Sequence, residues 1–408
     1  MKNAKIIFLI VISLFTLLLV SCIPGSAQPI GGWSGTTLHD STIYVGSRDG
    51  RVVAINASTE DLEWSYSIAP ATALTGGFSC GPATVSDAIY TAPIVDGDFI
   101  YIGTYSGKVL ALNTTARSQN PDLPEEPQDR YHEWETTIGT DVRNNAIVAD
   151  LVISGDVIYV SSSDGRVYSL RKDFGDQVKK SGILDEKHSK LWTSPVIEDD
   201  TLYVSTFDGY IYALSAETLE LLEWSFKLEA GFASSPVICG DTDTMFLGSF
   251  DRHLYAVKIG SDVLEWRFPE EPAGNWFWAS PVVNEGIVYA GCLDGKLYAI
   301  EADTGREIWS YPTEDQNGRP SSIVSSPVLM GNLLIAVNES GTVYVFDLDG
   351  ELANEGVPWW TISIGAGVRS SFCAQGGLVY IRGEDNQLYI VDIGNRQVSQ
   401  PILLTAEA

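Results

Sequence analysis

The stretch "LYAIEADTGREIW", residues 297–309, contains a short apolar run, a Thr-Gly turn and a final tryptophan. Weaker copies are "VVAINASTEDLEW" ending at Trp64, "YALSAETLELLEW" ending at Trp224 and "YAVKIGSDVLEW" ending at Trp266. Short segments rich in apolar and aromatic residues, separated by turn residues, are typical of β-strands. The recurrence of one such unit along the chain predicts a repeat protein built from sheets.

A second motif sets the number of repeats. The copy "YVGSRDG" ends at Gly50, and related copies end at Gly107, Gly165, Gly209, Arg252, Gly295, Gly341 and Asn386. The intervals between them are 57, 58, 44, 43, 43, 46 and 45 residues. Eight copies near a period of about 44 residues are typical of four-stranded sheets arranged radially. We therefore expect an all-β, eight-bladed β-propeller of four-stranded antiparallel blades.

Each copy is expected to contain four strands. In the sixth copy, "SPVVNEG" from Ser280 supplies the first strand and "IVYAG" the second, and Asp-Gly then turns the chain. "KLYAI" supplies the third strand and "REIWSY" the fourth. A tryptophan on the outer strand can fill the widening gap between two blades, burying roughly 200 Å². The third copy lacks this tryptophan if Trp192 belongs elsewhere.

These pieces resemble the pyrroloquinoline-quinone (PQQ) family repeat, whose pattern runs Ala-x-Asp-x-x-Thr-Gly-x-x-x-Trp. Residues 299–309 match it, with Glu301 in place of the aspartate, and the other copies match in part between Trp33 and Leu404. The resemblance implies a β-propeller, as in quinoprotein alcohol dehydrogenases and in the lipoprotein BamB. The repeat specifies the fold and says little about activity. We expect complete first and last blades that meet without exchanging a strand.

The N-terminal residues indicate export from the cytoplasm. Lys2 and Lys5 precede an apolar run of about fifteen residues, which is typical of a secretory signal and short for a membrane-spanning helix. "LVSC", ending at Cys22, resembles a bacterial lipobox. We therefore predict a signal peptide at 1–21, a lipidated N-terminus on Cys22 with a tether at 22–31, and the propeller at 32–408. The lipid would hold the chain on the cell membrane, facing outside the cytoplasm, in the outer leaflet or the periplasm.

The charge of the chain limits its partners. There are 25 Lys and Arg residues against 53 Asp and Glu residues, a formal net charge of −28. Nucleic-acid binding requires Lys and Arg to replace counterions, so we exclude DNA and RNA as partners. The acidity favours solubility through self-repulsion, and we expect a monomer.

The sequence lacks the features that the resemblance would imply for an enzyme. A quinoprotein dehydrogenase would carry adjacent cysteines over the cofactor, a calcium site and an aspartate base, and no Cys-Cys pair is present. We therefore expect no PQQ, no Ca²⁺ and no catalytic residue. The four histidines are scattered, and no Gly-x-Ser-x-Gly, P-loop or Cys-x-x-Cys motif occurs. The stretch "DLDGELANEG", 347–356, resembles a calcium loop but lies where the seventh blade needs its hairpin turn.

The remaining cysteines, Cys80, Cys239, Cys292 and Cys373, fall on separated blades or at different strand positions. Disulfides between them would be difficult geometrically, so we predict mostly buried free thiols.

A candidate binding surface comes from the residues just before each first strand. First strands line the channel of a propeller, so this column should surround one of its openings. The candidates are Trp33, Tyr90, Trp192, Trp276, Phe277, Trp278 and Arg369. Aromatic and arginine side chains often dominate contact energies. The competing interpretation is that they pack between blades, beneath the crossing segments.

Three functions are compatible with these observations. The favoured one is a non-enzymatic, lipid-anchored scaffold that binds a protein partner, as the resemblance to BamB implies. A PQQ-dependent dehydrogenase, or a degenerate relative of one, is the first alternative. A receptor for a carbohydrate or small molecule, bound at the aromatic opening, is the second.

Overall fold

A computed structural model describes residues 32–404, except 69–70, 74–82, 86, 116–130, 140–144, 183, 185–189, 241, 313–319 and 354. The predictions for the signal peptide, Cys22, the tether and Cys80 lie outside the described residues. Within them the chain is all-β, and no helix is long and apolar enough to cross a membrane.

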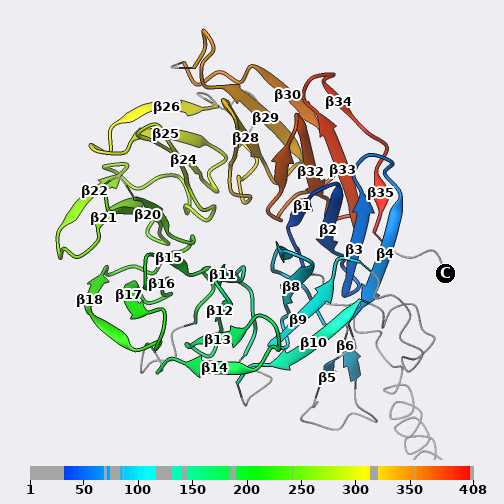
Figure 1. The fold of residues 1–408 in the computed structure, drawn as a ribbon. Coiled ribbons are helices and arrows are strands. Elements are labelled where there is room, and N and C mark those ends of the chain that lie inside the picture. The colour runs from blue at the N-terminus through cyan, green and yellow to red at the C-terminus, as the bar shows by residue number, and fades with distance from the viewer. Residues whose placement is uncertain are drawn as a thin grey trace, which may run out of the picture.

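Eight antiparallel sheets are arranged around a common axis, as the sequence predicts (Figure 1). Each of the first seven blades has four strands in consecutive order. Blade one contains β1 (Thr36–His39), β2 (Thr42–Gly46), β3 (Arg51–Asn56) and β4 (Leu62–Ser67). Blade two contains β7 (Ile94–Asp96), β8 (Phe99–Gly103), β9 (Lys108–Asn113) and β10 (His132–Thr137). Blade three contains β11 (Val152–Ser154), β12 (Val157–Ser161), β13 (Val167–Arg171) and β14 (Gln177–Lys180).

The next blades repeat this arrangement. Blade four contains β15 (Val196–Glu198), β16 (Thr201–Ser205), β17 (Tyr210–Ser215) and β18 (Leu221–Lys227). Blade five contains β19 (Val237–Cys239), β20 (Thr244–Gly248), β21 (Leu254–Lys258) and β22 (Leu264–Phe268). Blade six contains β23 (Val282–Asn284), β24 (Ile287–Gly291), β25 (Leu297–Glu301) and β26 (Glu307–Tyr311).

Blade seven repeats the arrangement, whereas blade eight differs at its outer edge. Blade seven contains β27 (Val328–Met330), β28 (Leu333–Val337), β29 (Thr342–Asp347) and β30 (Trp360–Ser363). Blade eight contains β31 (Cys373–Gln375), β32 (Leu378–Arg382), β33 (Gln387–Asp392), β34 (Gln397–Val398) and β35 (Ile402–Leu403). Both β34 and β35 pair with β33, so two short segments replace one outer strand.

The first strand of each blade is the innermost. Neighbouring first strands contact one another, including β11 with β15, β15 with β19, and β1 with both β7 and β31. Because each sheet is an antiparallel meander, the β2–β3 type of turn and the crossing between blades share one face. The β1–β2 and β3–β4 types of turn lie on the other. Below, these are called the crossing face and the hairpin face.

The hydrophobic core is divided among the gaps between blades. The described residues form eight apolar clusters, and each is built from two neighbouring blades. Strands that are covered on both sides read as nearly continuous apolar runs, which explains segments such as "IVYAG". No blade has a core of its own, so closure of the ring is required for burial.

The outer tryptophan fills the gap between blades, as predicted. Trp266 on β22 donates its indole N–H to the carbonyl of Ala302 in the next blade at 2.7 Å. Its ring lies against Gly305, where an added Cβ would come within 2.7 Å of the indole. Gly305 has a φ of +69°, which glycine adopts without steric cost. The tryptophan of one blade therefore packs against the Thr-Gly turn of the next blade.

Blade three confirms the expected irregularity. Its outer strand β14 has the sequence QVKK, and Trp192 lies before the first strand of blade four. The turn of blade four carries Leu219 where blade six has Gly305, with the same left-handed backbone at φ +56°. Leu219 is 2% exposed and joins the cluster between blades three and four. A leucine from one blade thus replaces the tryptophan missing from the other.

The ring closes without strand exchange. Blades one and eight are each complete, and they meet through an apolar cluster that contains Ile43, Val45, Tyr380 and Leu388. A hydroxyl joins β1 to β32, because Thr36 Oγ1 donates to the carbonyl of Tyr380 at 2.7 Å. We call this junction the seam.

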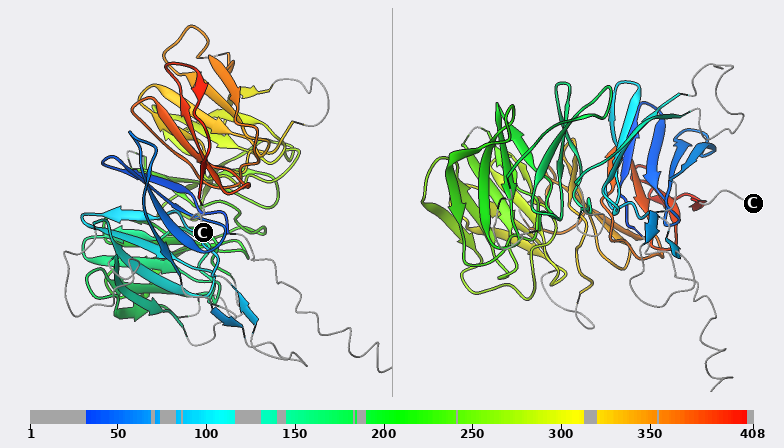
Figure 2. Two further views of the ribbon diagram at one scale, coloured as in Figure 1. Left: turned by 90° about the vertical axis from the view of Figure 1, so that its right-hand side faces the viewer. Right: turned by 90° about the horizontal axis from the view of Figure 1, so that it is seen from below.

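The long interval between blades one and two contains a small hairpin, β5 (Ala71–Ala73) with β6 (Ala83–Val85). Figure 2 shows this hairpin outside the ring of blades. The other long interval, of 58 residues between the second and third copies, includes residues 116–130, which lie outside the described residues. The segment 347–356 connects β29 to β30, which agrees with a hairpin turn.

Candidate functional site

The predicted channel-mouth residues lie in the crossing segments, three to six residues before the first strand of their blade. Most of them are partly exposed, and Trp33, Trp192 and Trp276 have exposed fractions of 39%, 36% and 41%. The described structure divides them into an aromatic group, a smaller aromatic group and a charged group. They do not form one uniform ring.

The largest group is a chain of touching aromatic rings, here called the aromatic arc: Trp192, Phe207, Phe250, Trp276 and Trp278. Ring centroids lie 4.8 Å apart for Trp192 and Phe207, and 4.7 Å apart for Phe207 and Phe250. Phe250 lies edge-on to Trp276 at 5.2 Å and to Trp278 at 6.2 Å. Edge-to-face rings at these distances attract one another beyond simple burial. The arc spans blades four to six.

Two members of the arc, Phe207 and Phe250, were not predicted as site residues. Both occupy the turn between the second and third strands, in the copies "YVSTFDG" and "FLGSFDR". The residue before Asp-Gly or Asp-Arg is therefore a second column that reaches the same opening. Aligning that column would have found both residues.

A second aromatic group lies at blades one and two. Trp33 packs edge-on to Tyr90 with centroids 4.8 Å apart, and Tyr90 lies 5.4 Å from Tyr105. Tyr105 also comes from the turn column and is 45% exposed. Burial raises the pKa of Tyr90, so its hydroxyl stays protonated at neutral pH.

Phe277 corrects the sequence prediction. Its side chain is fully buried, and its ring packs against Tyr298 with centroids 5.6 Å apart. It belongs to the core cluster of blades five and six and cannot contact a ligand at the opening. In an extended segment alternate side chains point to opposite sides, which places Phe277 inward and its neighbours Trp276 and Trp278 outward.

Arg369 belongs to a charged group on blades seven and eight. Its guanidinium contacts Glu339 at 2.6 Å and Glu384 at 2.9 Å. Both glutamates come from the turn column that supplies Phe207 and Phe250 elsewhere. The same two columns therefore supply the aromatic arc on blades four to six and an ionic group on blades seven and eight.

Beneath the opening, small polar residues join the inner strands of successive blades. The backbone N–H of Ser194 donates to Ser235 Oγ at 2.8 Å, that of Ser235 to Ser280 Oγ at 3.1 Å, and that of Ser280 to Ser326 Oγ at 3.0 Å. In blade three the aligned residue is Asp150, whose Oδ1 accepts from the N–H of Ala92 at 2.6 Å. Burial raises the pKa of Asp150 to about 6. These residues hold the blades together around the axis, a role that the recurrent Ser-Pro pattern could have suggested.

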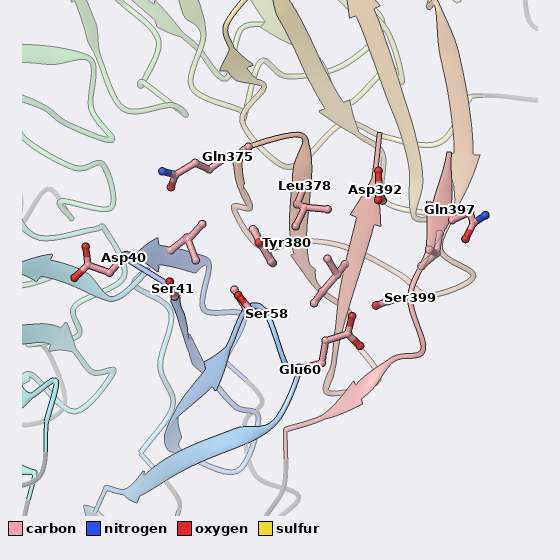
Figure 3. A pocket seen from close by; sticks show the side chains of 15 residues that line it. Asp40, Ser41, Ser58, Glu60, Gln375, Leu378, Tyr380, Asp392, Gln397 and Ser399 are labelled. Carbon is pink, nitrogen blue, oxygen red and sulfur yellow. The ribbon is translucent and has the colours of Figure 1, made fainter. Parts of the chain in front are cut away.

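A separate cavity of about 570 Å³ lies at the seam, among the hairpin-face turns of blades one and eight (Figure 3). Buried apolar side chains of Tyr380 and Ile390 line it. Its carboxylates are Asp40, Glu60 and Asp392, and no Lys or Arg is among its lining residues. The sequence does not predict this cavity.

Among the described residues, the donor side chains do not form the metal site that the resemblance to a quinoprotein dehydrogenase would imply. No group of three or more His, Cys, Asp or Glu side chains is placed to hold a metal ion in the described part of the chain. Cys239, Cys292 and Cys373 are free thiols on blades five, six and eight. Cys292 is fully buried, and burial raises the pKa of its thiol. These three cysteines agree with the prediction of free thiols, although Cys239 and Cys373 are only partly buried.

Comparison with known proteins gives the family. A family model described as outer membrane protein assembly factor BamB matches residues 24–181 and 183–400. BamB of Yersinia pestis is 22% identical over 319 residues, covering 76% of this chain and 70% of that protein. The solved structure of BamB from Moraxella catarrhalis has a TM-score of 0.64 at 17% identity and covers 88% of this chain and 93% of that one.

Part of the chain also resembles an enzyme. The quinohemoprotein alcohol dehydrogenase ADH-IIG of Pseudomonas putida is 28% identical over 157 residues, or 35% of this chain. The match spans only 21% of the dehydrogenase, about a fifth of its length. The family match covers nearly all of the propeller. The chain belongs to the family of outer membrane protein assembly factor BamB.

Proposed function

We propose that this protein is a non-enzymatic scaffold, anchored by lipid on Cys22 outside the cytoplasm, which binds a protein partner through the aromatic arc. Membership of the BamB family supports a role in assembly rather than catalysis. The proposed scaffold needs neither PQQ nor Ca²⁺. The donor side chains of the described residues support this, because they form no cluster suited to a metal.

The observation that carries the proposal is the aromatic arc itself. Five large rings contact one another at the crossing face, and Trp192 and Trp276 remain more than a third exposed. Contiguous exposed apolar patches mark interaction sites, and aromatic residues are enriched among contacts worth about 2 kcal/mol or more. Lys190 lies over Trp192 with its ammonium 5.3 Å from the ring centroid, which adds a polar margin to the surface.

Photo-crosslinking in the native membrane tests this proposal. A benzophenone amino acid replaces Phe207 in the full-length chain, and we expect one recurrent protein to be captured. The control carries the same group at Phe174, a 64% exposed phenylalanine in the β13–β14 turn on the hairpin face. Trp276→Ala should reduce the capture at Phe207 at least tenfold, since it removes an anchor of the arc. Equal capture at the two positions, or capture of nothing at Phe207, would reject the arc as the binding surface.

The anchor and the absence of catalysis have separate tests. Cys22→Ser should move the protein from the membrane fraction to the soluble fraction, since two or more acyl chains suffice for stable anchoring. Purified protein supplied with PQQ, Ca²⁺ and an alcohol should show no quinone absorbance in stoichiometric amount and no alcohol oxidation. Tight quinone binding would support the dehydrogenase instead.

A further inference from the structure

The seam cavity coincides with a place that a tryptophan occupies in other blades. The aligned outer-strand residues are Trp64, Trp134, Trp224, Trp266, Trp309 and Trp360. In blade six Trp309 lies opposite Ala299. In blade eight the residue opposite the aligned Ile390 is Ser399, whose N–H donates to the Ile390 carbonyl at 2.8 Å. Ser399 therefore stands where the tryptophan would be, and it lines the cavity.

The turn of blade one that borders the cavity also differs from its counterpart in blade six. In blade six the indole of Trp266 packs against Gly305. The N–H of Gly305 donates to the carbonyl of Glu301, four residues earlier. Glu60 of blade one occupies the same turn position, with φ +62° and the same bond to Asn56. A glutamate thus replaces the glycine, and its side chain is exposed. Neither Ser399 nor Glu60 fills the gap in the way that Leu219 does between blades three and four.

The remaining walls keep the character of the tryptophan site. Tyr380 aligns with Tyr289, whose ring contacts Trp309 with centroids 5.9 Å apart. The carbonyl of Ala57 aligns with that of Ala302, which accepts the indole N–H of Trp266. Ile390 in place of an alanine narrows the site, yet about 570 Å³ remains. This volume lies within the range of ligand-binding cavities, roughly 300–1,000 Å³.

The charge around the cavity is of one sign. Asp40, Glu60 and Asp392 are its ionisable carboxylates, and Asp40 and Glu60 are exposed. Hydrogen bonds from Asn395 lower the pKa of Asp392, which keeps that carboxylate ionised. An aromatic ring entering the apolar part would therefore place its neighbours beside negative charge.

We infer that the seam cavity binds an aromatic side chain of a partner polypeptide, with basic residues next to it in the partner's sequence. The apolar walls and the aligned carbonyl would receive the ring, and the carboxylates would pair with the flanking ammonium or guanidinium groups.

A polypeptide is the occupant that the fold itself indicates. In the gaps that contain an indole, such as that between blades five and six, the indole comes from the outer β-strand of the preceding blade. At the seam that strand is reduced to β34, two residues long, followed by β35. A partner segment could therefore supply the side chain that this outer strand does not. The site lies on the hairpin face and does not depend on the aromatic arc.

Isothermal titration of the full-length protein with short blocked peptides tests the inference. The probe is Lys-Trp-Lys, with Lys-Ala-Lys to remove the ring and Glu-Trp-Glu to reverse the charge. We expect saturable binding of Lys-Trp-Lys, and at least tenfold weaker binding of both other peptides. Binding should weaken as salt is added, because exposed charges are screened.

Two variants locate the binding. Ser399→Trp supplies an indole from the chain itself, and Glu60→Leu fills the cavity as Leu219 fills the gap after blade three. Each should weaken Lys-Trp-Lys at least tenfold, and Trp276→Ala in the aromatic arc should leave it unchanged. If Ser399→Trp does not fold, as judged by its thermal melt, Glu60→Leu decides alone. The inference is overturned if Lys-Trp-Lys fails to bind at millimolar concentration, if Lys-Ala-Lys binds equally well, or if the folded seam variants bind it as the parent does.

Discussion

Two gaps between blades lack the outer tryptophan, and they differ in what replaces it. Between blades three and four, Lys179 stands in the tryptophan position and Leu219 fills the space. Between blades eight and one, Ser399 stands there, Glu60 faces it, and a cavity remains. The missing tryptophan is thus replaced by Leu219 in one gap, whereas the other gap keeps a cavity. A cavity between two blades leaves the surrounding side chains without packing partners, which costs stability.

The largest expected effect concerns the repaired gap. Leu219→Ala should lower the free energy of unfolding by about 2–4 kcal/mol, because it leaves a hole among buried side chains. Ser399→Ala at the seam should change it by less than about 0.5 kcal/mol, because that space is already open. Urea denaturation followed by circular dichroism measures both.

A double variant checks the reasoning for blade three. The double variant Lys179→Trp, Leu219→Gly restores the indole and the glycine against which it packs in other blades. We expect this variant to recover most of the stability that Leu219→Ala loses. If the double variant were less stable than Leu219→Ala, the two residues would not be alternative fillings of one site.

A smaller effect concerns the inner edge of blade three, where Asp150 replaces serine. Its pKa is about 6 in the folded chain, owing to burial, and about 4 when unfolded. Between these values the folded chain keeps a proton that the unfolded chain has lost, so stability falls as pH rises from about 4 to 6. Asp150→Asn removes this titration and should stabilise the protein by about 1–2 kcal/mol at pH 7, reduced because the carboxyl is partly exposed.

The measurement is the difference in unfolding free energy between Asp150→Asn and the parent at pH 4, 5 and 7. We expect almost no difference at pH 4, and a difference that is complete by pH 7. A constant difference at all three values would show that Asp150 does not titrate in this range.

The smallest expected effect concerns the seam, where leucine replaces Glu60 as Leu219 occupies the same turn position in blade four. Glu60→Leu should raise the free energy of unfolding by about 0.5–1.5 kcal/mol, a usual gain from filling a cavity. Thermal melts of the variant and the parent at equal concentration provide the comparison. A loss of stability would mean that the two turns, although alike in backbone, do not point their side chains into equivalent spaces.

Much of the fold could be predicted from the sequence because the repeat is local. Asp-Gly turns, alternating strands and outer tryptophans each have a short-range cause, and their period gives the count of blades. The aromatic arc was predicted in part, since Trp192, Trp276 and Trp278 belong to it, and their role in binding stays a prediction. Phe277 was placed wrongly because a column of neighbours was read without the alternation of an extended segment.

The seam cavity could not be predicted in the same way. Aligning "QVS" at Gln397–Ser399 with "EIW" at Glu307–Trp309 shows that blade eight lacks the tryptophan. The same alignment shows a loss in blade three, where Leu219 of the next blade is buried in the gap. The side chain that fills a gap is decided by packing between two blades. At the seam these are blades one and eight, which are far apart in the sequence, so no local pattern predicts the outcome.

The complete first and last blades have a consequence for how the chain could be rearranged. Every sheet is made from one uninterrupted stretch, and the described chain begins and ends at adjoining blades, at Gly32 and Leu404. A linker between these ends, with a new opening in any crossing segment, would leave each set of paired strands intact. Circular permutants cut between blades should therefore refold, and a gene of this kind can grow or shrink by whole modules.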